Sequence, residues 1–274
     1  FRVKMSKRYK NRFDYWKKTS FSKSQWKELI TFAKKEKILF LSSVFSVDAV
    51  DLLYSLGQRV FKIGSGEFFS KNILDRIIKL KGSMIISTGM SFNHEITSQI
   101  KYLKGKKAKF VIMQCTSSYP SDFSNVNIHL IDYFKKKYKC LVGYSDHTGD
   151  IVAPILAIIK KISFLECHVQ DKVRPSNPDS TSSISLSGLN FLCEFKKKFY
   201  ESENNFNIKN KDKVAKLLFK NRILFRKSLA LKKNKKKGEL ITLSNLTMKK
   251  PGNGLNYEDI NKVLGKKLKN NKSC

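Results

Sequence analysis

Short apolar segments recur along this chain at intervals of about 20–30 residues, and amphipathic segments separate them. Each is apolar almost throughout rather than alternating, which is typical of strands buried on both faces of a sheet. The predicted strands are Ile38–Leu41, Val60–Ile63, Met84–Ile86, Phe110–Met113, Leu141–Gly143 and Phe164–Cys167. Helical spacing is shown before the first of them by Trp26, Leu29, Ile30 and Ala33, between them by Ile96, Ile100 and Leu103, and after the last by Leu192, Phe195 and Phe199.

Alternating strand and helix patterns predict an α/β fold with a parallel sheet, either a barrel or a doubly wound sheet. The lack of GxGxxG and P-loop motifs disfavours nucleotide-binding versions. Small, hydroxylic and ionisable residues follow strand after strand, and in a (β/α) barrel the carboxyl ends of the strands converge on one mouth, where active sites lie. These clusters, which favour a barrel, are Gly64–Glu67, Ser87–Met90, Gln114–Pro120, Tyr144–Thr148 and Glu166–His168.

The pattern changes after residue 200. The stretch Glu201–Lys213 is polar and weakly periodic, as expected of a linker. Beyond it the chain is rich in turn residues, with short apolar pieces between them. We therefore predict a first domain over residues 1–200, a linker over 201–220, and a small second domain with little helix over 221–274.

The net charge of +33 comes from 55 basic and 22 acidic residues. It suggests a nucleic acid or an acidic membrane surface as partner. Only eight of the basic residues are arginine, however, and the lysines are spread along the chain, which favours a composition typical of AT-rich coding and predicts no specific nucleic-acid or membrane partner. The sequence has no long apolar run and no apolar leader segment, and its five cysteines include no CxxC motif. We therefore expect a cytoplasmic protein with reduced thiols.

Two histidines are candidate metal ligands. His147 and His168 each follow a predicted strand, and those two strands are consecutive. Imidazoles on adjacent strand ends can meet at one divalent ion. Such a site would be open to water or substrate and suited to polarising a carbonyl oxygen. The alternative is that each histidine is a hydrogen-bonded structural residue.

Lys62 stands inside an apolar strand, where an ammonium group needs an anionic partner. A phosphate or carboxylate ligand would supply it, with the Ser65 and Ser87 hydroxyls and nearby glycine amides as further donors. The alternative is an ion pair with Glu67, which is also a candidate general acid or base. Asp179 lies in a loop rich in proline and serine and would by itself be assigned to a turn.

At these residues the chain resembles the N-acetylneuraminate (sialic acid) synthase family, with its legionaminate, pseudaminate and spore-coat polysaccharide relatives. The matching motifs, in the family's order, are KIGSGE at 62–67, STGM at 87–90, CTSSYP at 115–120, GYSDHT at 143–148, ECH at 166–168 followed by Pro178-Asp179, and KKPGNG at 249–254. The resemblance runs from about residue 12 to residue 265. It implies a TIM-type (β/α)8 barrel followed by a small antifreeze-like (SAF) domain.

The family's reaction condenses phosphoenolpyruvate with an N-acetylmannosamine-type sugar and releases phosphate. By motif, His147 and His168 would hold Mn²⁺, or Mg²⁺ or Co²⁺, and would with Glu67 form the catalytic set. The resemblance implies phosphoenolpyruvate binding by Lys62, Ser65, Ser87, Gly89 and Ser145, and sugar binding by Ser117, Tyr119, Asp179 and Lys250. It also implies a domain-swapped homodimer.

The chain departs from the family pattern at both ends. The family's first-strand Glu-Ile-Gly motif is missing, so we expect a barrel without its first strands and a chain incomplete at each end. Lys250 stands where the family has a sugar-binding arginine, and it keeps the charge without the bidentate fork. Ser117 stands where some members have asparagine. The serine makes this chain closer to the legionaminate or spore-coat type.

We therefore expect a cytoplasmic synthase of nonulosonic acids. One alternative is a catalytically inactive homologue retained as a sugar-binding or assembly subunit. Another is a polyanion-binding protein, suggested by the charge of +33.

Overall fold

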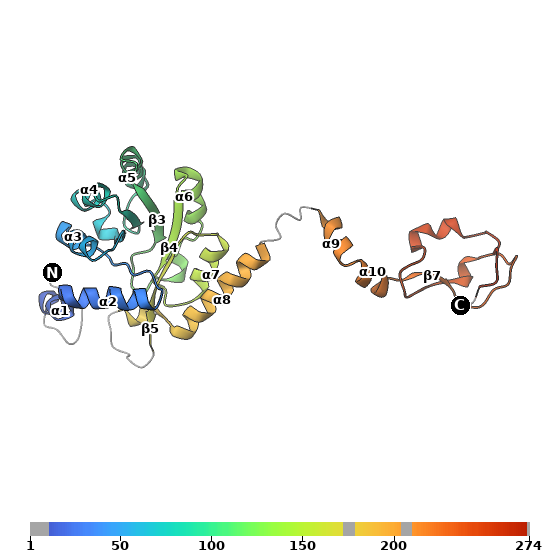
Figure 1. Cartoon of the computed structure of the whole chain (residues 1–274). Helices are drawn as coiled ribbons and strands as arrows, with labels where there is room; N and C mark the ends of the chain where they lie inside the picture. The colour runs from blue at the N-terminus through green and yellow to red at the C-terminus, as the bar shows by residue number, and fades with distance from the viewer. Residues whose placement is uncertain (1–10, 172–178, 204–209, 273–274) are drawn as a thin grey trace. The chain divides into compact units, whose positions relative to one another are not determined.

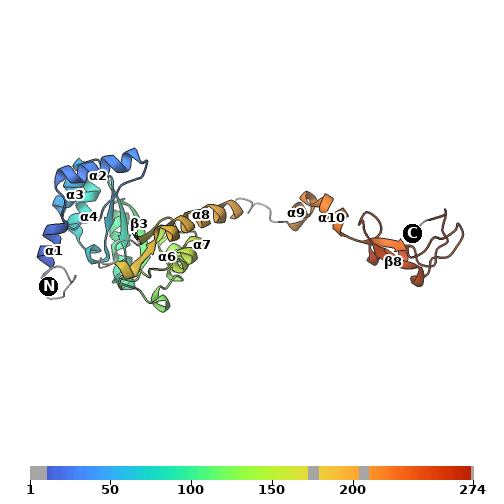
Figure 2. The same cartoon turned by 90° about the horizontal axis from the view of Figure 1, so that it is seen from below.

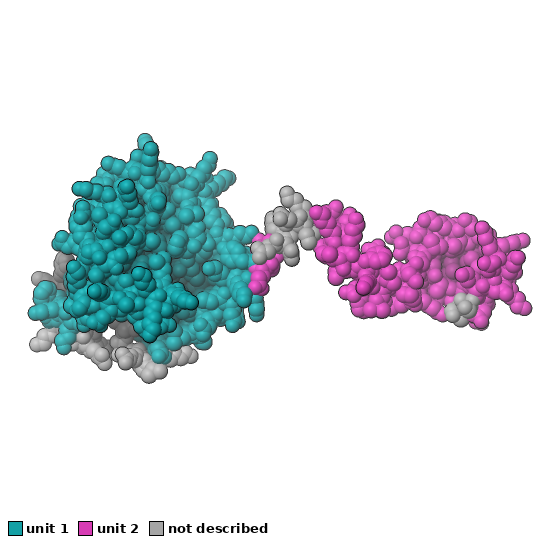
Figure 3. All heavy atoms as spheres, viewed as in Figure 1, with its two compact units in different colours: residues 1–200 teal, residues 201–274 magenta. Residues whose placement is uncertain are grey.

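Six parallel strands form one curled sheet, in the order in which they occur along the chain (Figure 1). The computed structural model describes residues 11–171, 179–203 and 210–272. The chain consists of two compact units, residues 1–200 and residues 201–274, which Figure 3 shows in different colours. The first unit is an α/β structure, as predicted.

The first unit contains helices α1 (Arg12–Thr19), α2 (Lys23–Lys35), α3 (Val47–Ser55), α4 (Lys71–Lys79), α5 (Asn93–Gly105), α6 (Leu130–Tyr138), α7 (Val152–Ile159) and α8, which begins there and spans Leu186–Glu203. Its strands are β1 (Val60–Ile63), β2 (Ser83–Ser87), β3 (Lys109–Cys115), β4 (Leu141–Asp146), β5 (Leu165–Gln170) and β6 (Ser183–Ser185). Helices α3 to α7 follow one another around the outer side of the curled sheet (Figures 1 and 2).

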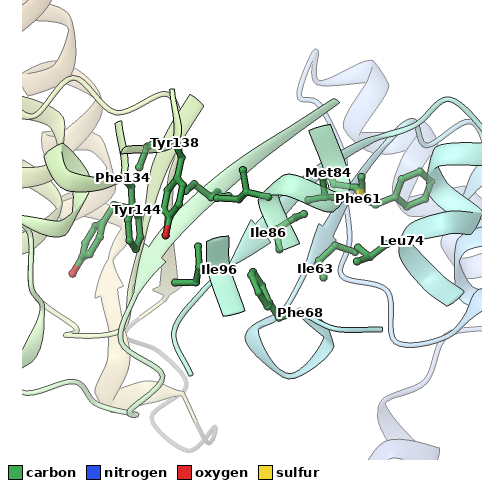
Figure 4. Packing of buried hydrophobic residues seen from close by; sticks show 14 of the residues in the cluster. Phe61, Ile63, Phe68, Leu74, Met84, Ile86, Ile96, Phe134, Tyr138 and Tyr144 are labelled. Atoms are coloured by element: carbon green, nitrogen blue, oxygen red, sulfur yellow. The ribbon is translucent and has the colours of Figure 1, made fainter. Parts of the chain in front are cut away.

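The main core lies between the sheet and these helices. Because successive side chains of a strand point to opposite faces, every second residue of each strand faces the helices. Phe61 and Ile63 of β1 and Met84 and Ile86 of β2 belong to this core, and each is at most 1% exposed. Figure 4 shows them beside Leu74 of α4. The other residues of each strand therefore face the inside of the curl.

One predicted strand is wrong. The segment Ile38–Leu41 is not a strand, and Ile38 and Leu39 are 65% and 73% exposed. The chain meets β1 only beyond it, through a single parallel bridge between Ser43 and Lys62. An apolar run becomes a buried strand only when a neighbouring strand and both faces cover it, and here the pairing is limited to that bridge.

The sixth strand was not predicted. Strand β6 is three residues long, and its only apolar residue is Ile184. It pairs with β5 in parallel, with His168 opposite Ser183. Its sequence, Ser-Ile-Ser, carries no apolar run, so its strand character comes from pairing with β5 rather than from its own pattern.

Five helices of the first unit end in the same way. Each is followed, within one or two residues, by a lysine in the left-handed backbone conformation, with φ between 47° and 58°. Glycine is the usual residue at such a position because it lacks the Cβ that makes this conformation unfavourable. The lysines are Lys37, Lys81, Lys107, Lys139 and Lys161.

The second unit contains α9 (Lys211–Leu217), α10 (Phe219–Phe225) and a two-stranded antiparallel sheet of β7 (Ser228–Leu231) and β8 (Leu246–Lys249). The predicted linker region 201–220 thus includes the end of α8 and all of α9, while residues 204–209 lie outside the described part. In the described part of the chain, no helix is long and apolar enough to cross a membrane.

We predict that Lys107→Gly stabilises the first unit by up to about 1 kcal/mol, because it removes the left-handed strain at this position. Its neighbour Lys106 has φ −83°, so Lys106→Gly should instead destabilise by about 0.5–1 kcal/mol. Urea unfolding followed by tryptophan fluorescence measures this unit alone, since the two tryptophans are Trp16 and Trp26. Equal effects of the two variants would contradict the prediction.

Candidate active site on the inner face of the sheet

Several of the side chains singled out in the sequence lie on one face of the sheet. The strand residues that face away from the helix-packed core are, at the carboxyl ends of the strands, Lys62, Ser87, Cys115, Ser145, Glu166 and His168. The pairing register places them side by side, since Cys115 is opposite Ser145 and Ser145 is opposite Glu166. The converging strand ends predicted from the sequence are therefore present.

Lys62 is a buried charged group on this face, with 7% of its surface exposed. Its Nζ donates a hydrogen bond of 2.7 Å to Ser87 Oγ and lies 3.4 Å from Glu166 Oε2. The ion pair that the sequence suggested, with Glu67, is therefore replaced by one with Glu166. Glu67 instead accepts a hydrogen bond from the Ser70 hydroxyl, within its own turn.

Ser65 and Gly89 form a tight group beside Lys62. The Gly89 amide donates to Ser65 Oγ at 3.2 Å, and the Ser117 hydroxyl donates to the same oxygen at 3.1 Å. Cys115 Sγ lies 3.4 Å from Ser65 Oγ. A Cβ at position 89 would come within 2.3 Å of Ser117 Oγ and 2.7 Å of Cys115 Sγ, so only glycine allows this close approach.

The two candidate metal ligands face each other. The ring centroids of His147 and His168 are 5.5 Å apart, and the Tyr119 ring lies 4.2 Å from His147 and 5.9 Å from His168. His147 Nδ1 lies 2.9 Å from the Thr116 carbonyl oxygen. A carbonyl only accepts, so Nδ1 carries the proton and Nε2 of the neutral ring keeps its lone pair. Burial lowers the pKa of His147, which favours that neutral form.

The remaining predicted residues are placed unequally. Asp179 Oδ2 lies 3.8 Å from His168 Nδ1, so this loop residue does reach the histidine pair. Ser145 is buried at the end of β4. Lys250 follows β8 in the second unit, where its Nζ lies 5.4 Å from the centre of the Phe225 ring. The structure thus brings together the residues from the first unit, and it describes Lys250 as part of the other unit.

Two carboxylates of the site had been given no role from the sequence. Glu166 is the partner of Lys62, and alternation from His168 along β5 could have identified it. Asp146 is 1% exposed and accepts hydrogen bonds from the Tyr144 hydroxyl and from the backbone and hydroxyl of Thr148. Burial raises the pKa of Asp146, and these bonds fix the loop that carries His147.

The donor set fits an open metal site rather than a closed one. Two imidazoles at this separation can both reach one ion when each nitrogen lies about 2 Å from it. Within residues 11–171, 179–203 and 210–272, no group of three or more histidine, cysteine, aspartate or glutamate side chains would enclose an ion. An ion held here would therefore depend on water or substrate to complete its coordination. The Thr116 contact at Nδ1 is the kind that orients a ligating histidine.

Comparison with known proteins places this chain in a family. The family model described as "NeuB family" matches residues 1–206. The N,N'-diacetyllegionaminic acid synthase of Campylobacter jejuni is 37% identical over 243 residues, which are 88% of this chain and 72% of that protein. The human N-acetylneuraminate-9-phosphate synthase is 28% identical over 251 residues, or 90% of this chain and 68% of that protein.

Solved structures agree on the architecture. The N-acetylneuraminic acid synthetase of Leptospira borgpetersenii, solved with citrate, superposes with a TM-score of 0.63 at 28% identity. The match covers 65% of this chain, and the chain spans 63% of that protein. A putative spore coat polysaccharide biosynthesis protein E from Chromobacterium violaceum has a TM-score of 0.65 at 17% identity, which supports the fold alone.

We predict that Lys62→Met changes the free energy of unfolding by less than about 1 kcal/mol, because methionine is apolar and the half-exposed Glu166 stays hydrated without its partner. Binding of inorganic phosphate should fall at least ~10-fold, since a charged hydrogen-bond donor is lost. Calorimetry and urea unfolding measure the two effects. Lys79→Met, at the exposed end of α4, is the control, and unchanged phosphate binding by Lys62→Met would contradict the assignment.

Proposed function

Because the chain belongs to the NeuB family, we propose that it is a nonulosonic acid synthase, which condenses phosphoenolpyruvate with an N-acetylmannosamine-type sugar and releases phosphate. The observation that carries this proposal is the buried Lys62 of β1, which is bonded to Ser87 and faces Glu166. On the same side of the sheet, His147 after β4 and His168 of β5 face each other. The first group suits an anionic substrate, and the second suits a carbonyl oxygen. A condensation between such partners needs both.

Phosphoenolpyruvate would lie against Lys62. The ammonium group is the one buried cation among the described residues of the inner face, and phosphoenolpyruvate supplies both a phosphate and a carboxylate. The hydroxyls of Ser65, Ser87 and Ser145 and the Gly89 amide are donors of the kind that bind phosphate oxygens. The Gly89 amide donates to Ser65 Oγ at 3.2 Å, and an oxygen of the substrate would replace Ser65 as its acceptor.

The sugar aldehyde would lie near the histidines, beside Tyr119, Asp179 and Ser117. C3 of phosphoenolpyruvate forms the new carbon–carbon bond to the aldehyde carbon, and the aldehyde oxygen takes up a proton. Water then adds at C2 and gives up its protons, the bond between C2 and the bridging phosphate oxygen breaks, and phosphate leaves with that oxygen while C2 becomes a carbonyl carbon. Glu166, which faces Lys62 on the inner face, and Glu67, which lies in the turn after β1 and accepts a hydrogen bond from Ser70, are the carboxylates that would accept or supply these protons.

A divalent ion, with Mn²⁺ proposed and Mg²⁺ or Co²⁺ as alternatives, would be held by His147 and His168. Such an ion supplies Lewis-acid polarisation of the aldehyde oxygen when it is bound. The protein's own part is to hold the two rings in place. Thr116 fixes His147, and Asp179 lies beside His168.

The second unit has a place in this proposal. We propose that it is the SAF domain and that Lys250 contacts the sugar in a homodimer in which the second unit of one copy serves the site of the other. A lysine at this position contributes one charged donor rather than a planar fork, so its contribution to affinity is smaller than an arginine's. We also propose that the protein acts in the cytoplasm.

The test is phosphate release from phosphoenolpyruvate, measured with N-acetylmannosamine and with its analogue that carries a second acetamido group at C4. We expect release only when a sugar is present, and a nonulosonic acid as co-product by mass spectrometry. Lys62→Met should reduce the rate at least ~100-fold, through the loss of both binding and orientation of the phosphate. A folded chain that binds phosphoenolpyruvate but turns over neither sugar would contradict the proposal and favour an inactive, sugar-binding homologue.

The metal is tested separately by electron paramagnetic resonance with Mn²⁺. We expect one tightly bound ion, and we expect its loss in His147→Ala because one imidazole alone holds Mn²⁺ weakly. His129→Ala is the matched control, since His129 is exposed and lies just before α6 without a side-chain capping bond. Binding that survives in His147→Ala would remove these histidines as ligands.

A further inference from the structure

Two lysine-rich segments of the second unit lie side by side. Residues 232–237 carry five lysines, and residues 266–272 carry four. Antiparallel bridges join Lys235 to Lys272 and Leu240 to Lys267. The Lys235 and Lys272 backbones exchange two hydrogen bonds of 3.0 Å, and the Lys237 amide donates to Asn271 Oδ1 at 2.8 Å. We call the surface formed by residues 232–240 and 264–272 the basic face.

The basic face is strongly and almost uniformly positive. It contains nine lysines and one acidic residue, Glu239, which gives a net charge of +8. Glu239 lies 3.1 Å from the Nζ of Lys235, the only one of the nine lysines that is partly buried rather than exposed. The other lysines are Lys232, Lys233, Lys236, Lys237, Lys266, Lys267, Lys269 and Lys272.

This arrangement works against folding. Like charges gathered on one surface repel one another, and the single acidic residue of the basic face, Glu239, is paired with Lys235 and so offsets only one of the nine lysines. Sequences that break a local rule of this kind tend to do so at functional sites. A polyanion held against the basic face would relieve the repulsion. The lysines appear evenly spread along the sequence, and pairing of the two segments is what concentrates these nine.

Exposed leucines accompany the lysines. Leu240, bridged to Lys267, is 50% exposed, and Leu264 is 39% exposed. Leu243, three residues after Leu240, is 59% exposed. Neither segment contains an arginine or an aromatic residue. Nucleic-acid surfaces use arginine for base edges and aromatic rings for stacking, whereas lysines next to aliphatic side chains suit the charged and apolar layers of a lipid surface.

We propose that the basic face docks the protein peripherally on an anionic lipid bilayer. The lysine ammonium groups contact lipid phosphates and carboxylates, and Leu240, Leu243 and Leu264 enter the interface between headgroups and acyl chains. This interaction goes beyond the proposed synthase activity and does not depend on it. It involves no membrane-spanning helix, and it revises the expectation from the sequence that the charge has no membrane partner.

The test is co-sedimentation of the full chain with vesicles of phosphatidylcholine, with and without phosphatidylserine, at low and moderate salt. We expect binding to the anionic vesicles alone, weakened by salt. The variant K236Q/K237Q/K267Q/K269Q removes four exposed charges of the basic face and should weaken partitioning at least ~10-fold, given the contribution of each lysine near an anionic surface. Leu240→Ser with Leu243→Ser should reduce the binding that remains at moderate salt.

The matched control, K34Q/K35Q/K197Q/K198Q, removes four exposed charges from α2 and α8 in the first unit. It should leave binding within about twofold of the unchanged chain, because those lysines lie outside the basic face. Equal losses in the two quadruple variants would show that bulk charge alone attracts the vesicles and would overturn the proposal. So would equal binding to neutral vesicles, or binding to duplex DNA that depends on the basic face while the anionic vesicles stay free.

Discussion

The ammonium group of Lys62 is the charge around which the inner face of the sheet is arranged. It is almost fully buried, and its neighbours in the fold are the Ser87 hydroxyl and the partly exposed Glu166 carboxylate. Burying a charge is unfavourable unless it is paired and hydrogen-bonded, so β2 and β5 must bring Ser87 and Glu166 to β1. The parallel register of the sheet satisfies this requirement, and the same register sets the positions of Ser145 and His168.

The site therefore combines two kinds of chemistry at one edge of the sheet. Next to Lys62, Ser65, Ser117 and Cys115 pack against Gly89, and the Gly89 amide and the serine hydroxyls, which bond one another here, are the donors that we propose turn to an anion. Across the sheet, the Thr116 carbonyl fixes the tautomer of His147, so that Nε2 of the neutral ring keeps a lone pair that could bind a metal ion. In the condensation that we propose from membership of the NeuB family, the group around Lys62 would bind phosphoenolpyruvate and the histidine pair would bind the metal ion beside the sugar aldehyde.

The two units contribute differently to this picture. The first unit holds all but one of the predicted site residues, and the second holds Lys250 and the basic face. A bilayer docked to the basic face would hold the enzyme at a surface through the second unit, while the chemistry stays on the sheet of the first. The two proposals rest on different residues, so either can fail without the other.

The sequence alone determined the strand–helix alternation, the polar strand ends and the family, because apolar runs and local motifs are properties of contiguous residues. Five of its six predicted strands are confirmed. It could not exclude Ile38–Leu41 or find β6, since strand formation there depends on the neighbouring strand rather than on the segment itself. Only the tertiary structure decided that Lys62 pairs with Glu166 rather than Glu67, and that two lysine runs join into one surface. Both depend on contacts between residues distant in sequence, which no local pattern encodes.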